Sequence, residues 1–184
     1  QSKSGGQDML NMSVKTELTD LTQVMEKLRS EAFVDKSKMS LFGASQGGVV
    51  ASLYAAAYPD RVHKLMLIFP AFVLFDDAKE TYRELGSPDF DQLPDSLTHH
   101  NATLGKIYLI DALDIDIQAE QANITAPTLI IHGTDDTVVP YQYAVQASQT
   151  IPNAELVTVE GGEHRIDERF AITAAPAIQK FLKE

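Results

Sequence analysis

The amino-acid sequence predicts an α/β fold in which a mostly parallel sheet is covered by helices on both faces. Two observations support this fold class. Short apolar segments rich in β-branched residues alternate along the chain with longer segments of helical periodicity. The chain has 184 residues, of which 44% are hydrophobic, and this is enough for one substantial core. A single domain over residues 1–184 is therefore expected.

The predicted elements follow one another from residue 13 onward, after a Gly- and Ser-rich start at residues 1–6 that resembles the end of a loop. The first is a helix over residues 13–29, with Ser13 as a suitable cap and apolar residues at helical spacing: Val14, Leu18, Leu21, Met25 and Leu28. Strands are expected over residues 39–42, 64–69, 128–132 and 155–159, and further helices near residues 46–58, 141–150 and 171–183. Residues 70–126 show weaker periodicity and interrupt this alternation.

The composition excludes several classes of function. A formal net charge of -11 argues against nucleic acid or an anionic membrane as a partner, because binding to phosphates requires clustered Lys and Arg. The absence of cysteine excludes disulfides, zinc thiolate sites and a cysteine nucleophile. No apolar run approaches the length of a membrane span, and the expected location is cytoplasmic.

The most specific motif is the pentapeptide Gly-Ala-Ser-Gln-Gly at residues 43–47, which follows an apolar stretch and precedes a predicted helix. A strand, a sharp turn with a serine and a helix are the context of a nucleophile elbow, with Ser45 at its apex. Such a turn forces neighbouring backbones together, so Gly43 and Gly47 are expected where a Cβ atom would not fit. The backbone N–H of Gln46, at the start of the helix, is the expected donor to an oxyanion.

A serine nucleophile needs a base and an orienting carboxylate, which can follow it in the order Ser, Asp, His. Asp135 and Asp136 lie in the turn after the β-branched run that ends at residue 133, and His164 lies just after the predicted strand 155–159. Open α/β sheets place their chemistry at the carboxyl ends of strands, so these side chains are expected near Ser45. His132, which precedes the turn glycine, is better suited to packing or hydrogen bonding than to catalysis.

The segments His-Gly-Thr-Asp-Asp-Thr-Val-Val-Pro at 132–140 and Gly-Gly-Glu-His at 161–164 resemble the acid and histidine loops of the α/β-hydrolase family. The resemblance implies that Asp136 is the acid, with Asp135 as the alternative, and that a small lid is inserted at about residues 71–126. The family has further strands before its elbow, and its second oxyanion donor comes from a His-Gly loop that does not precede Ser45 here. We therefore expect a carboxyl-terminal portion of a hydrolase, which associates with a missing amino-terminal portion or forms a homodimer.

Within that family the chain resembles bacterial cinnamoyl (feruloyl) esterases along nearly its whole length. The matching segments are Ser-Gln-Gly-Gly-Val-Val-Ala-Ser at 45–52, Tyr-Pro-Asp at 58–60, Leu-Pro-Asp at 93–95 and His-Gly-Thr-Asp-Asp-Thr-Val-Val at 132–139. In these esterases an acidic residue and a tyrosine of the lid contact the phenolic hydroxyl of the acyl group, and by position they correspond to Asp77 and Tyr108. Glu84 stands where the subfamily has a lid glutamine, and the resemblance implies that it binds substrate together with Asp77 and Tyr108. The structural alternatives are a solvated Asp77 and a half-buried, packing Tyr108.

The expected activity is hydrolysis of a small-molecule ester, with Ser45 as nucleophile, His164 as base and Asp136 as orienting acid, and with no cofactor or metal. A serine peptidase of the prolyl-oligopeptidase type uses the same three residues and is one alternative. A non-catalytic binding module is another. The adjacent His99 and His100 could suggest a metal, but no partners at metal-ligand spacing accompany them.

The charge of the predicted lid is also unusual. Residues 70–126 hold 11 Asp and Glu against 3 Lys and Arg, so most of the net negative charge lies there. Such charge indicates either a solvated face or a mouth that disfavours phosphorylated and other strongly anionic substrates.

Overall fold

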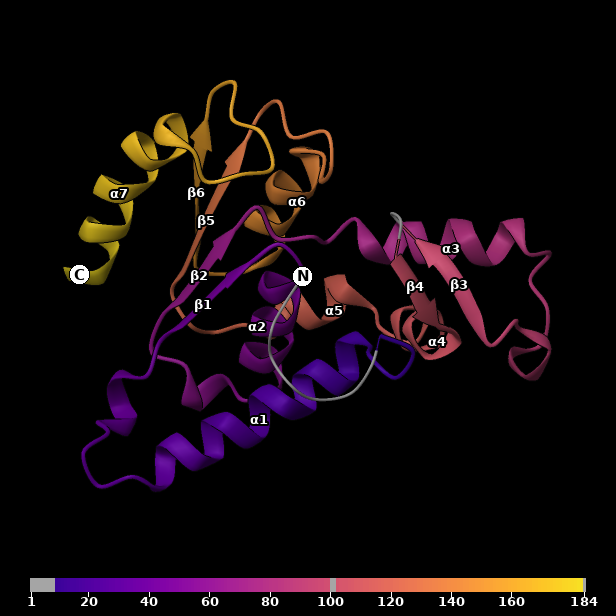
Figure 1. The fold of residues 1–184 in the computed structure, drawn as a ribbon. Coiled ribbons are helices and arrows are strands. Elements are labelled where there is room, and N and C mark those ends of the chain that lie inside the picture. Colours follow the sequence, from indigo (N-terminus) through magenta and orange to yellow (C-terminus); the bar gives the residue numbers. More distant parts are fainter. Residues whose placement is uncertain (1–8, 100–101, 184) are drawn as a thin grey trace.

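A computed structural model describes residues 9–99 and 102–183, so the expectations for residues 1–6 and for the side chains of His99 and His100 lie outside the described residues. Four strands form a parallel sheet in the order β1-β2-β5-β6 (Figure 1). Their bounds are β1 (Leu41–Ala44), β2 (Leu65–Ile68), β5 (Thr128–Gly133) and β6 (Ala154–Val159). Because neighbouring strands are parallel and in register, their carboxyl ends meet at one edge of the sheet.

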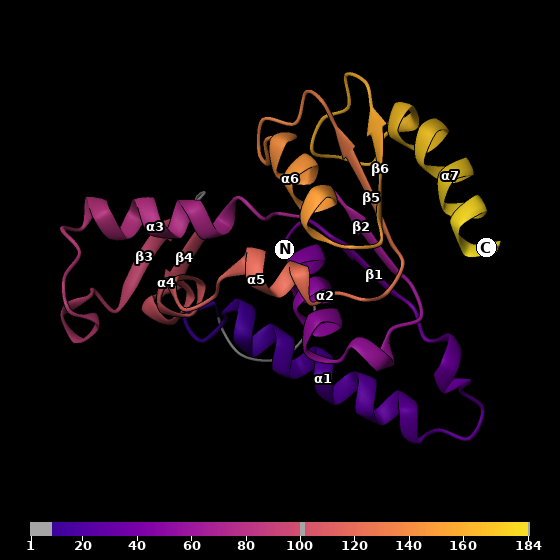
Figure 2. The same cartoon turned by 180° about the vertical axis from the view of Figure 1, so that it is seen from behind.

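Helices cover both faces of this sheet, as the sequence predicts. One face packs against α2 (Gln46–Ala57) and α6 (Gln142–Thr150), and α1 (Val14–Ser30) packs against α2. The opposite face is covered by α7 (Glu168–Lys183), which Figures 1 and 2 show on the far side of the sheet from α1 and α2. Alternate strand residues therefore enter two cores, Leu65 and Leu67 on the α2 side and Met66 and Ile68 on the α7 side.

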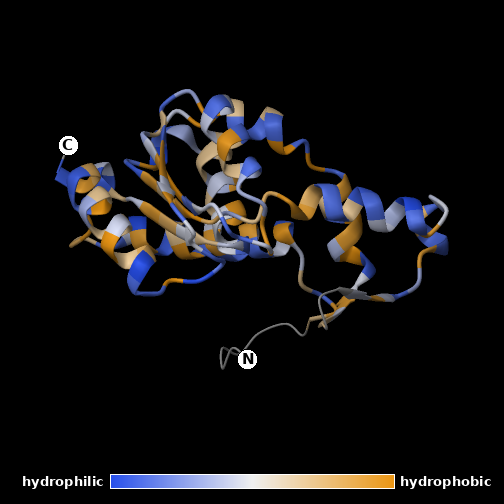
Figure 3. Ribbon diagram, turned by 90° about the horizontal axis from the view of Figure 1, so that it is seen from above, coloured by the Kyte–Doolittle hydropathy of each residue, from blue (hydrophilic) through white to orange (hydrophobic). Residues whose placement is uncertain are grey.

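The hydropathy of the elements follows their position. Helix α2 is apolar nearly all round and buried from Gly48 to Ala56, because it lies between the sheet and α1. The other long helices carry hydrophobic and hydrophilic residues side by side, as Figure 3 shows, which is typical of helices with one face on the core. None of the described helices is long and apolar enough to cross a membrane.

The described residues within 70–126, where the sequence shows weaker periodicity, form regular elements. They contain α3 (Leu74–Glu84), the short 3-10 helix η3 (Phe90–Gln92), the antiparallel pair β3 (Ser96–His99) and β4 (Ala102–Gly105), α4 (Lys106–Leu113) and α5 (Ile117–Ala122). Two of these elements are four-residue strands and one is a six-residue helix, which are too short to show a repeat in the sequence. Helix α3 has 11 residues, and it is not among the predicted helices despite this length. Helix α3 and the β3-β4 pair extend away from the sheet in both views (Figures 1 and 2), and we call residues 70–126 the inserted segment.

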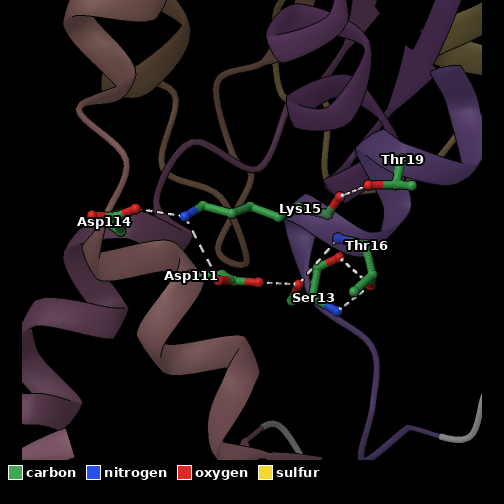
Figure 4. A network of polar contacts seen from close by, with 6 residues as sticks. All are labelled: Ser13, Lys15, Thr16, Thr19, Asp111 and Asp114. Carbon is green, nitrogen blue, oxygen red and sulfur yellow. Dashed lines mark hydrogen bonds and ion pairs between the residues drawn. The ribbon is translucent and has the colours of Figure 1, made fainter.

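The start of α1 is joined to the inserted segment by a polar network (Figure 4). Ser13 caps α1: its Oγ accepts the N–H of Thr16 at 3.2 Å, and Thr16 Oγ1 accepts the N–H of Ser13 at 2.8 Å. The Ser13 hydroxyl also donates to Asp111 Oδ2 of α4 at 2.5 Å. Lys15, the second residue of the helix, contacts Asp114 at 2.5 Å and Asp111 at 3.7 Å. The cap of one helix thus fixes the position of another that is distant in sequence.

Two elements differ from their predicted bounds by more than one residue. Strand β1 covers residues 41–44 rather than 39–42, because its ladder with β2 begins with Leu41 opposite Leu65 and continues to Ala44. Helix α7 begins at Glu168, before the predicted residue 171. Asp167 explains the earlier start, since its side chain accepts the N–H of Phe170 at 2.9 Å and so caps the first turn. Two further 3-10 helices, η1 (Lys36–Lys38) and η2 (Pro59–Arg61), lie in connections.

Candidate active site

Ser45 lies at a sharp turn between β1 and α2, in a backbone conformation that non-glycine residues rarely adopt. Its φ is 53° and its ψ is -127°. Such a conformation costs about 1–3 kcal/mol, so the surroundings must hold it in place. The Ser45 N–H donates to the carbonyl of Ile68 at 3.0 Å, and the Ser45 carbonyl accepts from the amides of Gly48 at 2.9 Å and Ala71 at 3.0 Å. The side chain is thereby presented at the carboxyl end of the sheet.

The two glycines of the pentapeptide do not share the role that the sequence assigned to both. A Cβ atom on Gly43 would lie 2.3 Å from the carbonyl oxygen of Gly47, so this position cannot accept a side chain without movement of backbone. A Cβ on Gly47 would meet nothing within 4 Å among the described residues. The steric requirement therefore holds for Gly43 and is wrong for Gly47, because the crowding comes from the backbone of the helix start facing the strand. A Cβ atom on Gly48 would have less space than one on Gly47, because it would lie 3.0 Å from Pro70 Cβ.

The structure brings Ser45, His164 and Asp136 together in a hydrogen-bonded series. His164 Nε2 lies 3.0 Å from Ser45 Oγ, and His164 Nδ1 lies 2.7 Å from Asp136 Oδ2. The imidazole also packs on the ring of Phe69, with centroids 4.4 Å apart. Asp135, the alternative acid, is exposed, and its Oδ1 accepts from the hydroxyl of Thr134 at 3.1 Å. Of the two aspartates, only Asp136 contacts His164.

The Asp136 carboxylate is buried, with 5% of the residue exposed, yet both of its oxygens are satisfied. Oδ1 accepts the backbone N–H groups of Val138 at 2.9 Å and Val139 at 2.8 Å, and Oδ2 faces His164. Hydrogen bonds to an ionised acceptor are among the stronger ones in proteins, so this loop stabilises a charged carboxylate. The negative charge is held against the imidazole and away from water.

A second histidine lies on the same carboxylate. His132, at the end of β5, is fully buried, with Nε2 2.9 Å from the carbonyl oxygen of Val139 and 3.1 Å from Asp136 Oδ2. Burial lowers the pKa of His132, an effect that outweighs the hydrogen bond to Val139 and the charge of Asp136. The sequence assigned it a packing or hydrogen-bonding role, and the structure shows both.

Ser45 opens into a cavity of about 240 Å³ at the boundary between the sheet and the inserted segment. Asp77 of α3 and Tyr108 of α4 both line this cavity. Its other lining residues are Met9, Met12, Gln46, Ala71, Val73, Leu74, Ala102, Leu104, Val138 and Val139, which make it mainly apolar. A small apolar cavity with a few polar groups beside a nucleophile is typical of a small-molecule site.

Glu84 does not join this site. It is exposed and is the last residue of α3, seven positions after Asp77. At 1.5 Å per residue this places it about 10 Å further along the helix axis, beyond the cavity. Its assignment as a substrate-binding residue followed a position in related sequences, and the helix carries that position away from Ser45.

Tyr108 is connected to the nucleophile elbow by a polar network that the sequence did not indicate. Its hydroxyl donates to Gln46 Oε1 at 2.9 Å, and Gln46 Nε2 donates to Glu17 Oε2 of α1 at 2.6 Å. Burial, with the charges of Glu17 and Asp77, raises the pKa of Tyr108 to about 12, so its hydroxyl stays protonated. Glu17 carried no sequence signal, because it is one of several charged residues on a helix distant from the motif.

A larger cavity, of about 500 Å³, lies between α3, α5 and α6 and contains none of Ser45, Asp136 and His164. Two of its acids already have partners, since Asp76 contacts Lys79 at 3.0 Å and Asp114 contacts Lys15 at 2.5 Å. Among the residues that the structure describes, no group of three or more His, Asp or Glu side chains is arranged to hold a metal ion. Of these two cavities, only the smaller is lined by Ser45.

Comparison with known proteins gives a family and several structural relatives. The sequence profile of the prolyl oligopeptidase family matches residues 8–184. Est1E from Butyrivibrio proteoclasticus, solved with ferulic acid bound, is similar to this chain with a TM-score of 0.85 and 29% identity, over 99% of this chain and 72% of that one. Mouse alpha/beta hydrolase domain-containing protein 10 shares the fold, with a TM-score of 0.74 and 20% identity over 99% of this chain and 74% of that chain.

Several curated relatives are hydrolases by name, and the chain spans only part of their length. A putative carbamate hydrolase, RutD, of Stutzerimonas stutzeri is 39% identical over 70 residues, which cover 38% of this chain and 26% of that protein. The mouse serine hydrolase BPHL is 26% identical over 162 residues, covering 79% of this chain and 55% of that protein.

Proposed function

We propose, from the premise that this chain belongs to the prolyl oligopeptidase family of α/β-hydrolases, that it hydrolyses carboxylic esters through an acyl-enzyme. The observation that carries the proposal is the series Ser45, His164, Asp136, with 3.0 Å and 2.7 Å contacts, whose Ser45 lines a mainly apolar cavity. A hydroxyl is a weak nucleophile unless a base removes its proton, and this geometry supplies that base.

In the proposed reaction, His164 Nε2 takes the proton of Ser45 as the oxygen attacks the ester carbonyl. Asp136 holds the imidazole with its second nitrogen protonated and stabilises the cation that forms. The N–H of Gln46, the first amide of α2, donates to the oxyanion, since it has no partner within its helix. The protonated His164 then gives its proton to the departing alcohol. Water repeats these steps on the acyl-enzyme and releases the acid, with no cofactor or metal.

For the substrate we propose a hydroxycinnamoyl ester or another small aryl or short-chain ester. Support comes from the ferulic acid bound to Est1E and from Asp77 and Tyr108, which line the same cavity as Ser45. In this proposal the inserted segment is a lid, because it supplies one wall of the cavity. Its carboxylates would disfavour strongly anionic esters. Nucleic acids and membranes are not proposed as partners, and the proposed location, which cell fractionation tests, is cytoplasmic.

The experiment that tests the proposal compares the full-length protein with Ser45→Ala on p-nitrophenyl butyrate and methyl ferulate. We expect turnover of both esters by the unchanged protein and loss of at least about a thousandfold in kcat for Ser45→Ala, because the nucleophile is missing. Ser40→Ala, which removes an exposed serine close by in the chain, is the control and should keep full activity. Ester turnover that survives Ser45→Ala removes Ser45 from the mechanism.

The family match favours a second candidate, a peptidase of the prolyl-oligopeptidase type. A proline-containing peptide p-nitroanilide separates the two, because an esterase site of this kind should cleave it far more slowly than an aryl ester. A non-catalytic binding module is tested by covalent labelling with a fluorophosphonate. An intact, folded protein that is not labelled on Ser45 favours the binding module over both enzymes.

A further inference from the structure

His132 is a fully buried side chain with one ring nitrogen that makes no hydrogen bond among the described residues. It pairs with Thr158 in the β5-β6 ladder, is 0% exposed, and its Nδ1 has no hydrogen-bond partner among the described residues. Buried polar atoms without partners are rare and need an explanation. The mechanism proposed above does not use this side chain, although it lies directly against Asp136.

The contacts of the other ring nitrogen fix the state of His132. Nε2 faces two acceptors, the Val139 carbonyl at 2.9 Å and Asp136 Oδ2 at 3.1 Å, so the proton belongs on Nε2 by inference from its neighbours. A second proton on Nδ1 would be a buried donor with nothing to receive it, which is costly. His132 is therefore a neutral donor at physiological pH, in agreement with the lowering of its pKa by burial.

The bond from His132 closes a ring of contacts around the acid. The Val139 carbonyl oxygen accepts a hydrogen bond from His132 Nε2–H, and the Val139 N–H donates to Asp136 Oδ1 at 2.8 Å. Val138 donates to the same oxygen at 2.9 Å. The loop from Asp136 to Val139 is thus held from the strand side by His132, and this leaves Oδ2 directed at His164.

We propose that His132 is a positioning residue for Asp136: it braces the acid loop through Val139 and places a neutral donor beside Oδ2. This role rests on the proposed hydrolase function. An apolar side chain of similar size would fill the same volume but would leave the Val139 carbonyl without its buried donor. The loop could then relax, and small displacements of catalytic groups lower rates steeply.

The surroundings contain few groups that could take over this role or perturb it. The charged or titratable groups on the described elements that face His132 are Asp136 and His164, from the loops after β5 and β6. The ring of Tyr141 lies edge-on with its centroid 6.0 Å away, and its hydroxyl is already within 2.5 Å of Thr158 Oγ1.

The test compares His132→Leu, which removes the donor, with His132→Gln, whose side-chain amide can reach the same carbonyl. For His132→Leu we expect kcat for an aryl ester to fall about tenfold to a hundredfold with little change in KM. The acid limb of its pH profile should move to higher pH, because Asp136 loses a donor and attracts the proton on His164 more strongly. His132→Gln should restore most of kcat and the wild-type limb. His63→Leu, at an exposed histidine, is the control.

A measurement on the unchanged protein keeps the proposal falsifiable if the variants fold poorly or no ester is turned over. Side-chain nitrogen NMR should show His132 as the Nε2-protonated tautomer without titration between about pH 5 and 8. Titration of His132 in that range, or a proton on Nδ1, overturns the proposal. So does a folded His132→Leu protein with wild-type kcat and pH profile, or a His132→Gln protein no more active than His132→Leu. If the protein turns over no ester but His132 shows the expected NMR spectrum, the result counts against the proposed hydrolase function and not against the state proposed for His132.

Discussion

The backbone strain at Ser45 is tolerated because one neighbouring position has no side chain, and a pair of substitutions tests this. Gly43→Ala should destabilise the protein by about 1–3 kcal/mol or more, because the new Cβ would collide with the Gly47 carbonyl at 2.3 Å. Gly47→Ala should be neutral or stabilising by up to about 1 kcal/mol, because its Cβ has space and alanine favours a helix. Urea unfolding and fluorophosphonate labelling measure both effects. Equal losses for the two variants would contradict this account.

Glu17 is the residue at the site whose titration should change stability. Burial raises its pKa above the ordinary 4.5, although the bond from Gln46 opposes this, and Asp20 adds a smaller upward effect. The folded protein therefore binds this proton more tightly than the unfolded chain, so stability falls as pH rises through the window that begins near 4.5. Glu17→Gln should raise Tm at pH about 7 and lose that advantage below pH about 4. Glu155→Gln, at an exposed glutamate, is the control, and a lower Tm for Glu17→Gln at neutral pH would refute the prediction.

The sequence could predict the site residues that lie in motifs at strand ends, and it could not predict those whose role depends on tertiary contacts alone. Ser45, Asp136 and His164 each sit in a loop after a strand, so topology alone predicts that they meet. Glu17 and His132 act through partners on other elements, Gln46 and the Val139 carbonyl, and no spacing rule reports such contacts. Glu84 was assigned by analogy, and the length of α3 places it outside the cavity.

At the scale of elements, the residue that caps α1 also holds a second helix, α4. Ser13 is fully buried, closes the capping box with Thr16 and donates to Asp111 of α4 (Figure 4). Ser13→Ala should lower the free energy of unfolding by about 1–2 kcal/mol, because it removes the cap and leaves Asp111 without that donor. The control is Thr19→Ala, further along the same helix, which removes an exposed hydroxyl bonded to the Lys15 carbonyl. It should change the free energy of unfolding by less than about 0.5 kcal/mol. Denaturant titration measures the free energy of unfolding of both variants. Equal losses for Ser13→Ala and Thr19→Ala would show that the polar network adds no stability.

The elements that could be predicted are those long or apolar enough to show a period. All four sheet strands and the helices that flank them have this pattern, and the structure has them within a few residues of the predicted bounds. The shift of β1 reflects its pairing with β2, and the earlier start of α7 reflects the cap at Asp167; both depend on contacts rather than on propensity. Apart from α3, the inserted segment is built from elements too short for a clear period, so their positions depend on tertiary packing.

At the scale of the whole molecule, the β1 edge of the four-stranded sheet is open among the residues that the structure describes. β1 is the outer strand of the sheet, and beside its backbone Phe42 remains 55% exposed on the face that α7 covers elsewhere. An uncovered parallel edge with an apolar side chain is a template for a further strand. The sequence alone predicts such a strand from another part of the polypeptide or from a second copy, and the Est1E chain also extends beyond the region that this chain matches.

The 184-residue chain by itself should therefore self-associate through β1, and a charge placed on that edge should prevent it. Phe42→Lys should shift the protein toward monomer in light scattering after size-exclusion chromatography, because the lysine keeps its ammonium in water and blocks a neighbouring strand. Phe33→Lys is the matched control: it makes the same chemical change at a side chain that is 83% exposed but lies in a loop after α1, away from the sheet. If both variants lower association equally, general hydrophobicity drives it rather than the edge. A chain that stays monomeric at about 100 μM without any substitution shows that β1 does not pair with a second copy under these conditions.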